Sequence, residues 1–193
     1  MRWETHPLTS DRYDDLAKVV NPRRRAHRCR CLAGCPIFDE THDSWCETRE
    51  QRLIRLSEQQ PPAGVLVYRD GAAVGWCQVA ARNWAWSTPI HPSGESGSLA
   101  QTRVWEISCI VVRPGIRRQG VTAHLIEGAV EYAASEGACA IESYPVNPRG
   151  RIDPQTASVG TKIMFDRTGF RVVGVTKMRV SRMSRLVMRR ELS

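Results

Sequence analysis

Residues 117–122 form a short basic stretch that could hold a phosphate group. The sequence there is Arg-Arg-Gln-Gly-Val-Thr, with Gly120 in fourth place. A strand-like run before it and a helix-like run after it place these residues at a helix N-terminus, where backbone N–H groups and the helix dipole attract anions. Gly120 has no Cβ, so a pyrophosphate can approach the main chain closely, while Arg117 and Arg118 supply positive charge. The stretch therefore predicts a phosphate-binding turn.

Side chains of the types that bind zinc are concentrated in residues 21–43, namely His27, Cys29, Cys31, Cys35 and His42. A Cys-x-Cys pair followed by a third cysteine lacks the paired C-x₂-C knuckles of most zinc sites, so we expect no bound metal there. The whole chain has seven cysteines. In a chain of this size we expect reduced thiols rather than a disulfide framework.

The basic stretch is positioned by a strand before it and a helix after it. Residues 105–112 are rich in β-branched side chains and are followed by Pro114-Gly115, which predicts a buried strand that ends in a break. From Val121 onward, apolar residues recur at every fourth position with charged residues turned away, which predicts an amphipathic helix. Gly137 is the expected C-terminal stop of this helix.

Caps, turns and periodicity predict the remaining elements. The first is an edge strand at 2–5, followed by a helix that is capped within 9–11 and ended by Asn21-Pro22. A second helix has a capping box at Ser44 and Glu47 and stops near Pro61-Pro62, and a hairpin of 64–69 and 73–81 then turns at Asp70-Gly71. The later elements are a strand at 139–143, a helix at 158–167, and strands at 171–176 and 184–190 joined by a basic link. Residues 83–102 form a long loop whose Trp84 and Trp86 either line a substrate site or hold the loop to the domain.

Length and composition predict one globular domain over residues 1–193, with a helical region at about 1–62 and a core at about 64–193. The hydrophobic fraction is 41% and the charged fraction 25%, and no apolar run approaches the roughly 18 residues of a membrane span. The first fifteen residues lack the apolar core of a signal peptide. We therefore expect a cytoplasmic protein that makes no use of a membrane.

The formal net charge of +8 suits a protein that binds a phosphorylated cofactor, and it also suits a nucleic-acid partner. Apart from Arg23-Arg24-Arg25 and the last segment, the positive residues are scattered and interleaved with acids. This distribution is typical of a soluble basic surface, and no known nucleic-acid-binding module is visible. Nucleic acid is accordingly the least favoured partner.

Residues 104–137 resemble the GNAT superfamily of N-acetyltransferases, which use acyl-CoA. The family signature is Q/R-x-x-G-x-G/A; Arg117 and Gly120 match it, and Thr122 stands where the family has Gly or Ala. Residues from about 64 to 192 also follow the family's order of elements. A bacterial subset with an N-terminal Cys-x-Cys is most similar, on the strength of Cys29-Arg30-Cys31, Val74-Gly75-Trp76-Cys77 and Glu142-Ser143-Tyr144-Pro145-Val146.

The resemblance implies an α/β fold with a central mixed, largely antiparallel sheet that is splayed at the signature strand and flanked by helices. It implies that acetyl-CoA, the co-substrate, lays its pantetheine arm along Ile110, Val111 and Val112. The Ile110 N–H would then lie near the thioester carbonyl, where an amide donor stabilises an oxyanion. The pyrophosphate would lie on the turn made of Arg117, Arg118, Gln119, Gly120, Val121 and Thr122.

Glu106 lies fourteen residues before Gly120, where histone-type members of the family carry a general-base glutamate. Strand alternation predicts that it shares a face with Ser108 and Ile110. Desolvation by apolar neighbours would raise its pKa toward the working pH, as a base for an ammonium ion requires. The other interpretation is a structural carboxylate paired with one of the arginines.

Other side chains near this strand are weaker candidates. Phe165 stands where the family often has a tyrosine general acid, and Phe cannot donate a proton. Tyr144 is a candidate substitute, although a tyrosine at such a place commonly packs its ring and forms local hydrogen bonds. Cys109, expected on the opposite strand face from Glu106, is better explained as a small core residue than as a nucleophile.

The sequence therefore predicts an acetyl-CoA-dependent N-acetyltransferase that acylates an amine on a small molecule or a protein. One rival hypothesis is a non-catalytic acyl-CoA-binding module, which is favoured by Phe165 in place of a tyrosine and by Thr122 in place of Gly or Ala. The other is a basic nucleic-acid-binding protein, which would show steep salt dependence. The acceptor is not evident from the sequence, and a homodimer is left open.

Overall fold

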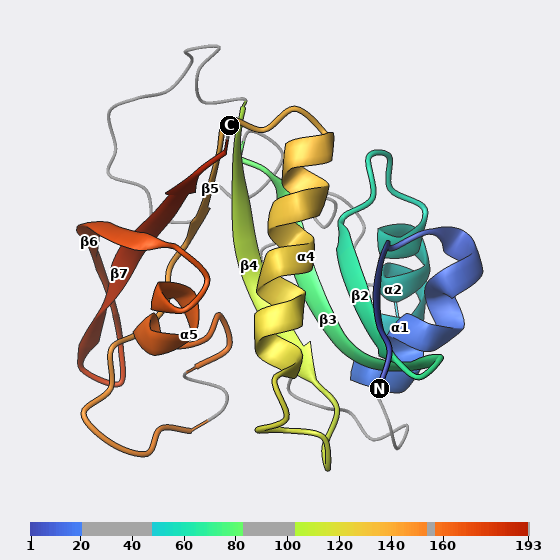
Figure 1. The fold of residues 1–193 in the computed structure, drawn as a ribbon, viewed down its shortest axis with the longest axis horizontal. Helices are drawn as coiled ribbons and strands as arrows, with labels where there is room; N and C mark the ends of the chain where they lie inside the picture. The colour runs from blue at the N-terminus through green and yellow to red at the C-terminus, as the bar shows by residue number, and fades with distance from the viewer. Residues whose placement is uncertain (21–47, 83–102, 154–156, 193) are drawn as a thin grey trace.

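The computed structural model of the chain describes residues 1–20, 48–82, 103–153 and 157–192. Seven strands in these residues form one open sheet in the order β1-β2-β3-β4-β5-β7-β6 (Figure 1). The strands are β1 (Trp3–Pro7), β2 (Gly64–Arg69), β3 (Ala72–Ala81), β4 (Val104–Val112), β5 (Ala140–Ser143), β6 (Arg171–Val180) and β7 (Met183–Glu191). All neighbouring strands are antiparallel except β4 and β5, which are parallel. This is the mixed, largely antiparallel sheet that was predicted.

Helices cover both faces of the sheet and enclose two apolar cores. On one face lie η1 (Ser10–Arg12), α1 (Tyr13–Val20) and α2 (Arg49–Ser57), whose buried residues pack against Leu66 and Trp76. On the other face lie α4 (Val121–Ser135) and α5 (Lys162–Asp166), which pack against Trp105 and Ile107. Figure 1 shows α4 lying along the central strands. None of the helices in the described residues is long and apolar enough to cross a membrane.

Two glycines let α4 approach the sheet closely. A Cβ at Gly75 on β3 would lie 2.8 Å from Leu125 Cδ1, and a Cβ at Gly128 on α4 would lie 2.4 Å from Thr5 Cγ2. Both distances are shorter than a side chain tolerates, so glycine sets the separation between α4 and the sheet at these two points.

The first hairpin forms as predicted. Asp70 and Gly71 have φ of 50° and 79°, the left-handed values that a two-residue turn of this type requires. The second hairpin differs from the prediction, because β6 continues to Val180 and β7 begins at Met183. Ser181 and Arg182 form its turn with φ of 49° and 65°. Of the basic residues in the predicted link, Lys177 and Arg179 therefore belong to an edge strand, which tolerates charge, and Arg182 lies in the turn.

Two helix boundaries also differ from the prediction. The capping box of α2 is made by Thr48 and Gln51, with Gln51 N donating to Thr48 Oγ1 at 3.2 Å and Thr48 N donating to Gln51 Oε1 at 2.7 Å. The predicted box at Ser44 and Glu47 lies outside the described residues. Helix α5 starts only at Lys162, because Gly160 has φ of 96° and Thr161 is extended.

Candidate active site

The predicted phosphate-binding turn lies at the N-terminus of α4. Gly120 is the N-cap residue, with φ of 83°, and a Cβ placed there would meet no atom within 4 Å. Arg117, Arg118 and Gln119 are exposed, and Arg69 donates a hydrogen bond to Gln119 Oε1. The first N–H groups of any helix lack an intrahelical acceptor. The turn therefore presents donors, positive charge and open space to an anion, and Val121 and Thr122 begin the helix behind it.

Strand β4 separates from β5 halfway along its length. The two strands pair from Val104↔Ala140 to Ile107↔Ser143, and β4 then continues to Val112 paired, among the described strands, with β3. Beyond Ser143, Val146 forms single bridges with Thr161 and Arg185. This is the predicted splay of the sheet at the signature strand, and its open end lies near the start of α4 (Figure 1).

The predicted oxyanion donor already has a partner in this structure. The Ile110 N–H donates to the Ser158 carbonyl oxygen at 3.0 Å, so residue 158 bridges the splay at that point. An acyl carbonyl bound at Ile110 would have to replace the Ser158 oxygen.

A β-bulge at Ser108 overturns one prediction about β4. The register moves from Val79↔Ile107 to Gln78↔Cys109, which leaves Ser108 as an extra residue. The side chains beyond it change face, so that Cys109 and Val111 pack in the α1/α2 core, while Ile110 and Val112 pack against the α4 core. Glu106 therefore does not share a face with Ile110, and Cys109 is not on the opposite face from Glu106.

Glu106 lies in the middle of the sheet on the α1/α2 face and is only 3% exposed. Its Cα partners are Ala80 on β3 and Glu142 on β5. Glu142, which the sequence analysis did not single out as a site residue, is 4% exposed. Two buried carboxylates thus occupy neighbouring positions, one residue pair before the point where β4 and β5 separate.

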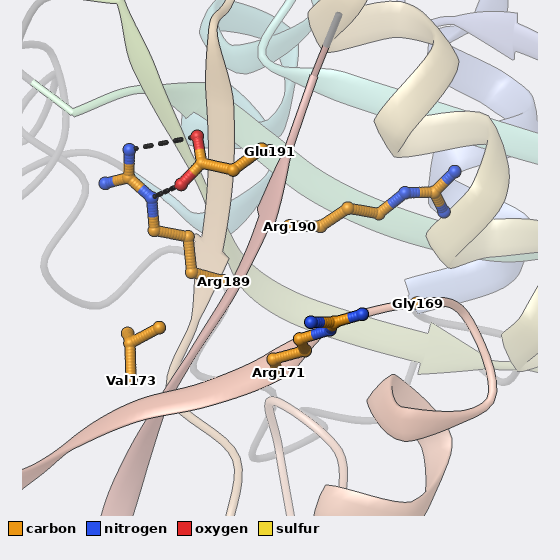
Figure 2. A pocket seen from close by; sticks show the side chains of 6 residues that line it. All are labelled: Gly169, Arg171, Val173, Arg189, Arg190 and Glu191. Atoms are coloured by element: carbon orange, nitrogen blue, oxygen red, sulfur yellow. Dashed lines mark hydrogen bonds and ion pairs between the residues drawn. The ribbon is translucent and has the colours of Figure 1, made fainter.

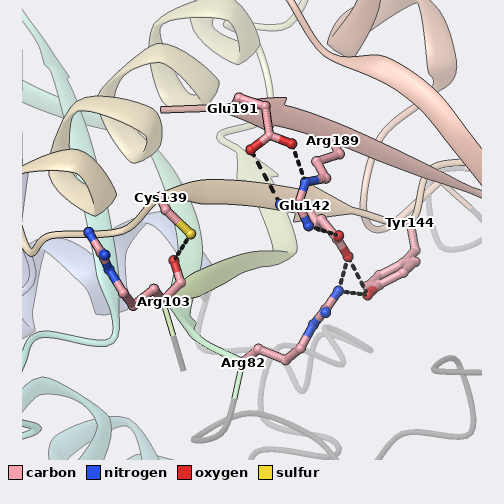
Figure 3. A network of polar contacts seen from close by, with 7 residues as sticks. All are labelled: Arg82, Arg103, Cys139, Glu142, Tyr144, Arg189 and Glu191. Atoms are coloured by element: carbon pink, nitrogen blue, oxygen red, sulfur yellow. Dashed lines mark hydrogen bonds and ion pairs between the residues drawn. The ribbon is translucent and has the colours of Figure 1, made fainter. Parts of the chain in front are cut away.

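Glu142 is the centre of a polar network (Figure 3). Arg82, just beyond β3, forms an ion pair with Glu142 Oε2, and Arg189 Nη1 lies 3.1 Å from Glu142 Oε1. The Tyr144 hydroxyl lies 3.2 Å from Glu142 Oε2 and 3.4 Å from Arg82 Nη2. No sequence signal pointed to this network, because it depends on the register of β5 against β7.

Tyr144, Phe165 and Cys109 are all buried. Burial, with the nearby Glu106 and Glu142, raises the pKa of Tyr144, which makes its phenol a poor acid for a thiolate. Phe165 packs edge-on against Phe170 with ring centroids 5.1 Å apart. Burial raises the pKa of Cys109 to about 12, as expected of a core thiol.

A hollow of about 430 Å³ lies elsewhere, at the β6/β7 edge, and is lined by Gly169, Arg171, Val173, Arg189, Arg190 and Glu191 (Figure 2). Its two central arginines already have partners: Arg189 binds Glu191, and Arg190 Nη1 binds Glu127 at 2.9 Å. Figure 2 shows the two guanidinium groups pointing in opposite directions. The guanidinium groups of Arg189 and Arg190 therefore do not converge on one anion.

Several predicted features lie outside the described residues, namely Cys29, Cys31, Cys35, Trp84 and Trp86. Within the described ranges, no three His, Cys, Asp or Glu side chains are grouped as they would be around a metal ion.

Comparisons with known proteins agree with this geometry. Residues 32–149 match the model of a family described as "Acetyltransferase (GNAT) family". No curated protein matches the chain. Among solved structures, a GNAT-family acetyltransferase from Streptococcus pneumoniae is similar over 100% of both chains, with a TM-score of 0.60 and 16% identity.

Two further structures share the fold. An N-acetyltransferase from Staphylococcus aureus Mu50 matches with a TM-score of 0.59 and 10% identity over 100% of both chains. The PaiA N-acetyltransferase from Thermoplasma acidophilum, solved in complex with coenzyme A, matches with a TM-score of 0.55 and 14% identity, also over 100% of both chains. The family model covers more than half of the chain, which therefore belongs to the acetyltransferase (GNAT) family.

Proposed function

We propose that this acetyltransferase transfers an acetyl group from acetyl-CoA to an amine by direct attack, with Glu106 as the proton acceptor. The observation that carries the proposal is the open N-terminus of α4 beside the splay of β4 and β5. This arrangement offers an anion site beside a strand edge on which, among the described strands, β5 no longer pairs with β4. The acceptor amine belongs to a small molecule or to a protein.

Acetyl-CoA fits the residues present. Its pyrophosphate would bind at Arg117–Thr122, where Gly120 leaves open space and two arginines are exposed. Its pantetheine arm would take the place of a strand beside Ile110–Val112, once Ser158 releases the Ile110 N–H. The main chain of β4 then provides the binding contacts, and the side chains of these residues remain in the two cores.

The reaction requires that the amine and the thioester be held in position and that one group accept a proton. The amine nitrogen attacks the thioester carbonyl carbon, a C–N bond forms and the C–S bond breaks. The Ile110 N–H stabilises the charge that develops on the carbonyl oxygen. Glu106 accepts the proton that the amine loses, directly or through one water, and the departing thiolate takes a proton from solvent.

The test is release of free CoA from acetyl-CoA in the presence of a panel of amines, namely benzylamine, tyramine, spermidine and short peptides with free N-termini. We expect release that depends on the amine and on enzyme concentration, together with an acetylated product seen by mass spectrometry. Calorimetry with acetyl-CoA alone, in the absence of any amine, distinguishes an enzyme from a protein that only binds acyl-CoA. Binding with no product from any amine would favour a non-catalytic acyl-CoA-binding module.

A further inference from the structure

The phosphate-binding turn has a backbone that the surrounding chain must hold in place. Gly115 and Gly120 have φ of 88° and 83°, and Arg118 between them has φ of 64°. A residue with a Cβ adopts such a conformation uncommonly and keeps it only where neighbouring contacts impose it. The N–H groups of a turn converge on one anion only while this backbone is kept. The contacts that fix the turn therefore bear on anion binding.

The side chain of Gln119 ties the turn to itself and to the sheet. Its Nε2 donates to the Gly115 carbonyl oxygen at 3.4 Å, and its Oε1 accepts a hydrogen bond from Nη1 of Arg69, the last residue of β2. A guanidinium only donates, so the amide oxygen must face Arg69 and the amide nitrogen then faces the carbonyl. One carboxamide thus links the two ends of the turn to β2.

Arg69 reaches the turn from a well-supported position. Its Cα partner on β1 is Trp3, so both side chains lie on the same face of the sheet, where Trp3 packs against the α4 core. The guanidinium carbon lies 6.0 Å from the centroid of the Trp3 ring, within cation–π range. The Trp3 ring also stacks on His124 of α4, with centroids 4.1 Å apart and planes at 25°. These contacts place the Arg69 guanidinium between the aromatic ring on β1 and the turn that precedes α4.

Strand β3 holds the beginning of the same segment. The Arg113 N–H donates to the Val74 carbonyl oxygen at 3.0 Å, and its Nη1 donates to the Ala73 carbonyl oxygen at 3.1 Å. The segment is thus attached to β3 where it leaves β4, and to β2 through Arg69 where it approaches Gly120. A binding site that is already held in its bound geometry loses less conformational entropy when the ligand binds, which raises affinity.

We propose that Arg69 is a positioning residue for the acetyl-CoA site: through Gln119 it holds the phosphate-binding turn in the conformation that receives the pyrophosphate. The proposal rests on the place of that site given under the proposed function. Arg69 and Gln119 then act as one unit, so that loss of either removes the same contribution to affinity. An arginine that bound the phosphates directly would instead contribute independently of Gln119.

The first test is a double-mutant cycle on acetyl-CoA affinity, measured by isothermal titration calorimetry on variants that urea denaturation shows to be folded. Gln119→Met removes the carboxamide without changing the charge of the turn, and it should weaken binding about tenfold, the contribution of one hydrogen bond to a charged group. Arg69→Met should weaken binding by a similar factor.

The double variant decides whether the two residues act together. Its loss of affinity should stay near tenfold, whereas independent contributions would multiply to about a hundredfold. A multiplied loss would overturn the proposal, because Arg69 would then act on the anion without Gln119. Unchanged affinity in either single variant would overturn it as well.

The second test measures the order of the turn in the protein without ligand, and Gln119→Met alone suffices for it if Arg69→Met fails to fold. Backbone ¹⁵N order parameters of residues 115–120 should fall from about 0.85 in the wild type to below about 0.6 in the variant. Those in the middle of α4 should not change. A turn that stays rigid without the Gln119 carboxamide would overturn the proposal.

Arg2→Met is the matched control, because it removes a cation from the same corner of the sheet. The Arg2 main-chain N–H donates to Asp70 Oδ1 at 2.8 Å, and its side chain, 80% exposed, pairs with Glu4 at 3.0 Å. Solvent screens so exposed a charge, and acetyl-CoA affinity should change by less than about twofold. A loss equal to that of Arg69→Met would show that charge alone is responsible and would overturn the proposal.

The two tests separate this proposal from the proposed function. A wild-type protein that binds acetyl-CoA, with variants that bind equally well, contradicts the role of Arg69 and leaves the acetyl-CoA site in place. A wild-type protein that does not bind acetyl-CoA contradicts the proposed function, and the role of Arg69 fails with it.

Discussion

Gly120 combines two properties at one residue: a left-handed backbone and open space above it. Gly120→Val should abolish acetyl-CoA binding, because a branched side chain would stand where the pyrophosphate approaches the helix N-terminus. The same change also strains the backbone by about 1–2 kcal/mol. Isothermal titration calorimetry with acetyl-CoA measures the binding, and urea unfolding measures the strain.

Gly137 supplies the control for that variant. It has φ of 80°, also faces open space, and follows the other end of α4. Gly137→Val should therefore lose similar stability and keep acetyl-CoA affinity. Equal affinity in both folded variants would remove the turn from the binding site.

Glu106 is the residue on which the proposed chemistry depends. Glu106→Gln keeps the size of the side chain and removes its basicity, so it should preserve acetyl-CoA affinity and lower turnover by about 10²–10⁴-fold. The loss should shrink as pH rises, since more of the amine is then already neutral. Pre-steady-state CoA release at several pH values measures the effect. Near-normal turnover at neutral pH, with chemistry rate-limiting, would reduce Glu106 to a structural carboxylate.

At the scale of elements, the position of α4 on the sheet connects packing to binding. Gly75→Ala places a methyl group against Leu125 and Val121 in the first turns of α4, and Gly128→Ala places one against Thr5. Each change overpacks a close contact and should destabilise the protein by about 1–3 kcal/mol. Only Gly75→Ala should also weaken acetyl-CoA binding, because it displaces the helix end that carries the phosphate turn.

The pair is compared by urea denaturation and by calorimetry at a temperature where both variants are folded. Equal losses of affinity would mean that α4 moves as one rigid body when it is overpacked anywhere. Full affinity in Gly75→Ala would mean that the turn keeps its geometry independently of the helix beneath it.

Sequence reasoning succeeded where local signals decide the structure. Asp70-Gly71 specifies its turn through backbone conformation, and the four-residue period after Val121 specifies the buried face of α4. It failed where one extra residue changes the alternation of a strand. The bulge at Ser108 places every later side chain of β4 on the other face of the sheet, and no local sequence signal predicts this bulge. The helix at 158–167 was predicted too long because its apolar periodicity runs through Gly160, whose left-handed backbone does not continue a helix.

The candidate site was predicted only in part. The turn at Arg117–Thr122 and the choice of Glu106 as proton acceptor follow from contiguous residues and the family resemblance, and both roles stay predictions. The shared face of Glu106 and Ile110 was predicted wrongly. The contacts of Glu142 depend on the pairing of β5 with β7, which joins residues 47 positions apart. Such long-range register is decided by the whole sheet, so Arg82, Glu142 and Arg189 could not have been grouped in advance.

At the scale of the whole molecule, positive charge gathers at one edge of the sheet. Strand β6 is the last strand of the sheet and exposes Val173 and Val175, 59% and 62% accessible. Arg171, Lys177 and Arg179 lie on the same strand and are exposed. Cations on an edge strand oppose its pairing with a second copy of itself. A homodimer, if one forms, should therefore use another surface.

Burial of several weak acids makes the whole protein sensitive to alkali. Burial raises the pKa of Cys109 to about 12 and that of Cys77 well above its usual value, and it also raises the pKa of Tyr132. Above about pH 9 the unfolded chain releases protons that the folded chain retains, so the free energy of unfolding must fall as pH rises. Each fully buried thiol contributes a fall of about 1.4 kcal/mol per pH unit until its folded pKa is reached. Urea denaturation between pH 8 and 11 measures this slope of the unfolding free energy against pH. Cys109→Ala should make the slope smaller by the contribution of one thiol. An unfolding free energy that stays constant over this range would show that the thiols ionise without unfolding.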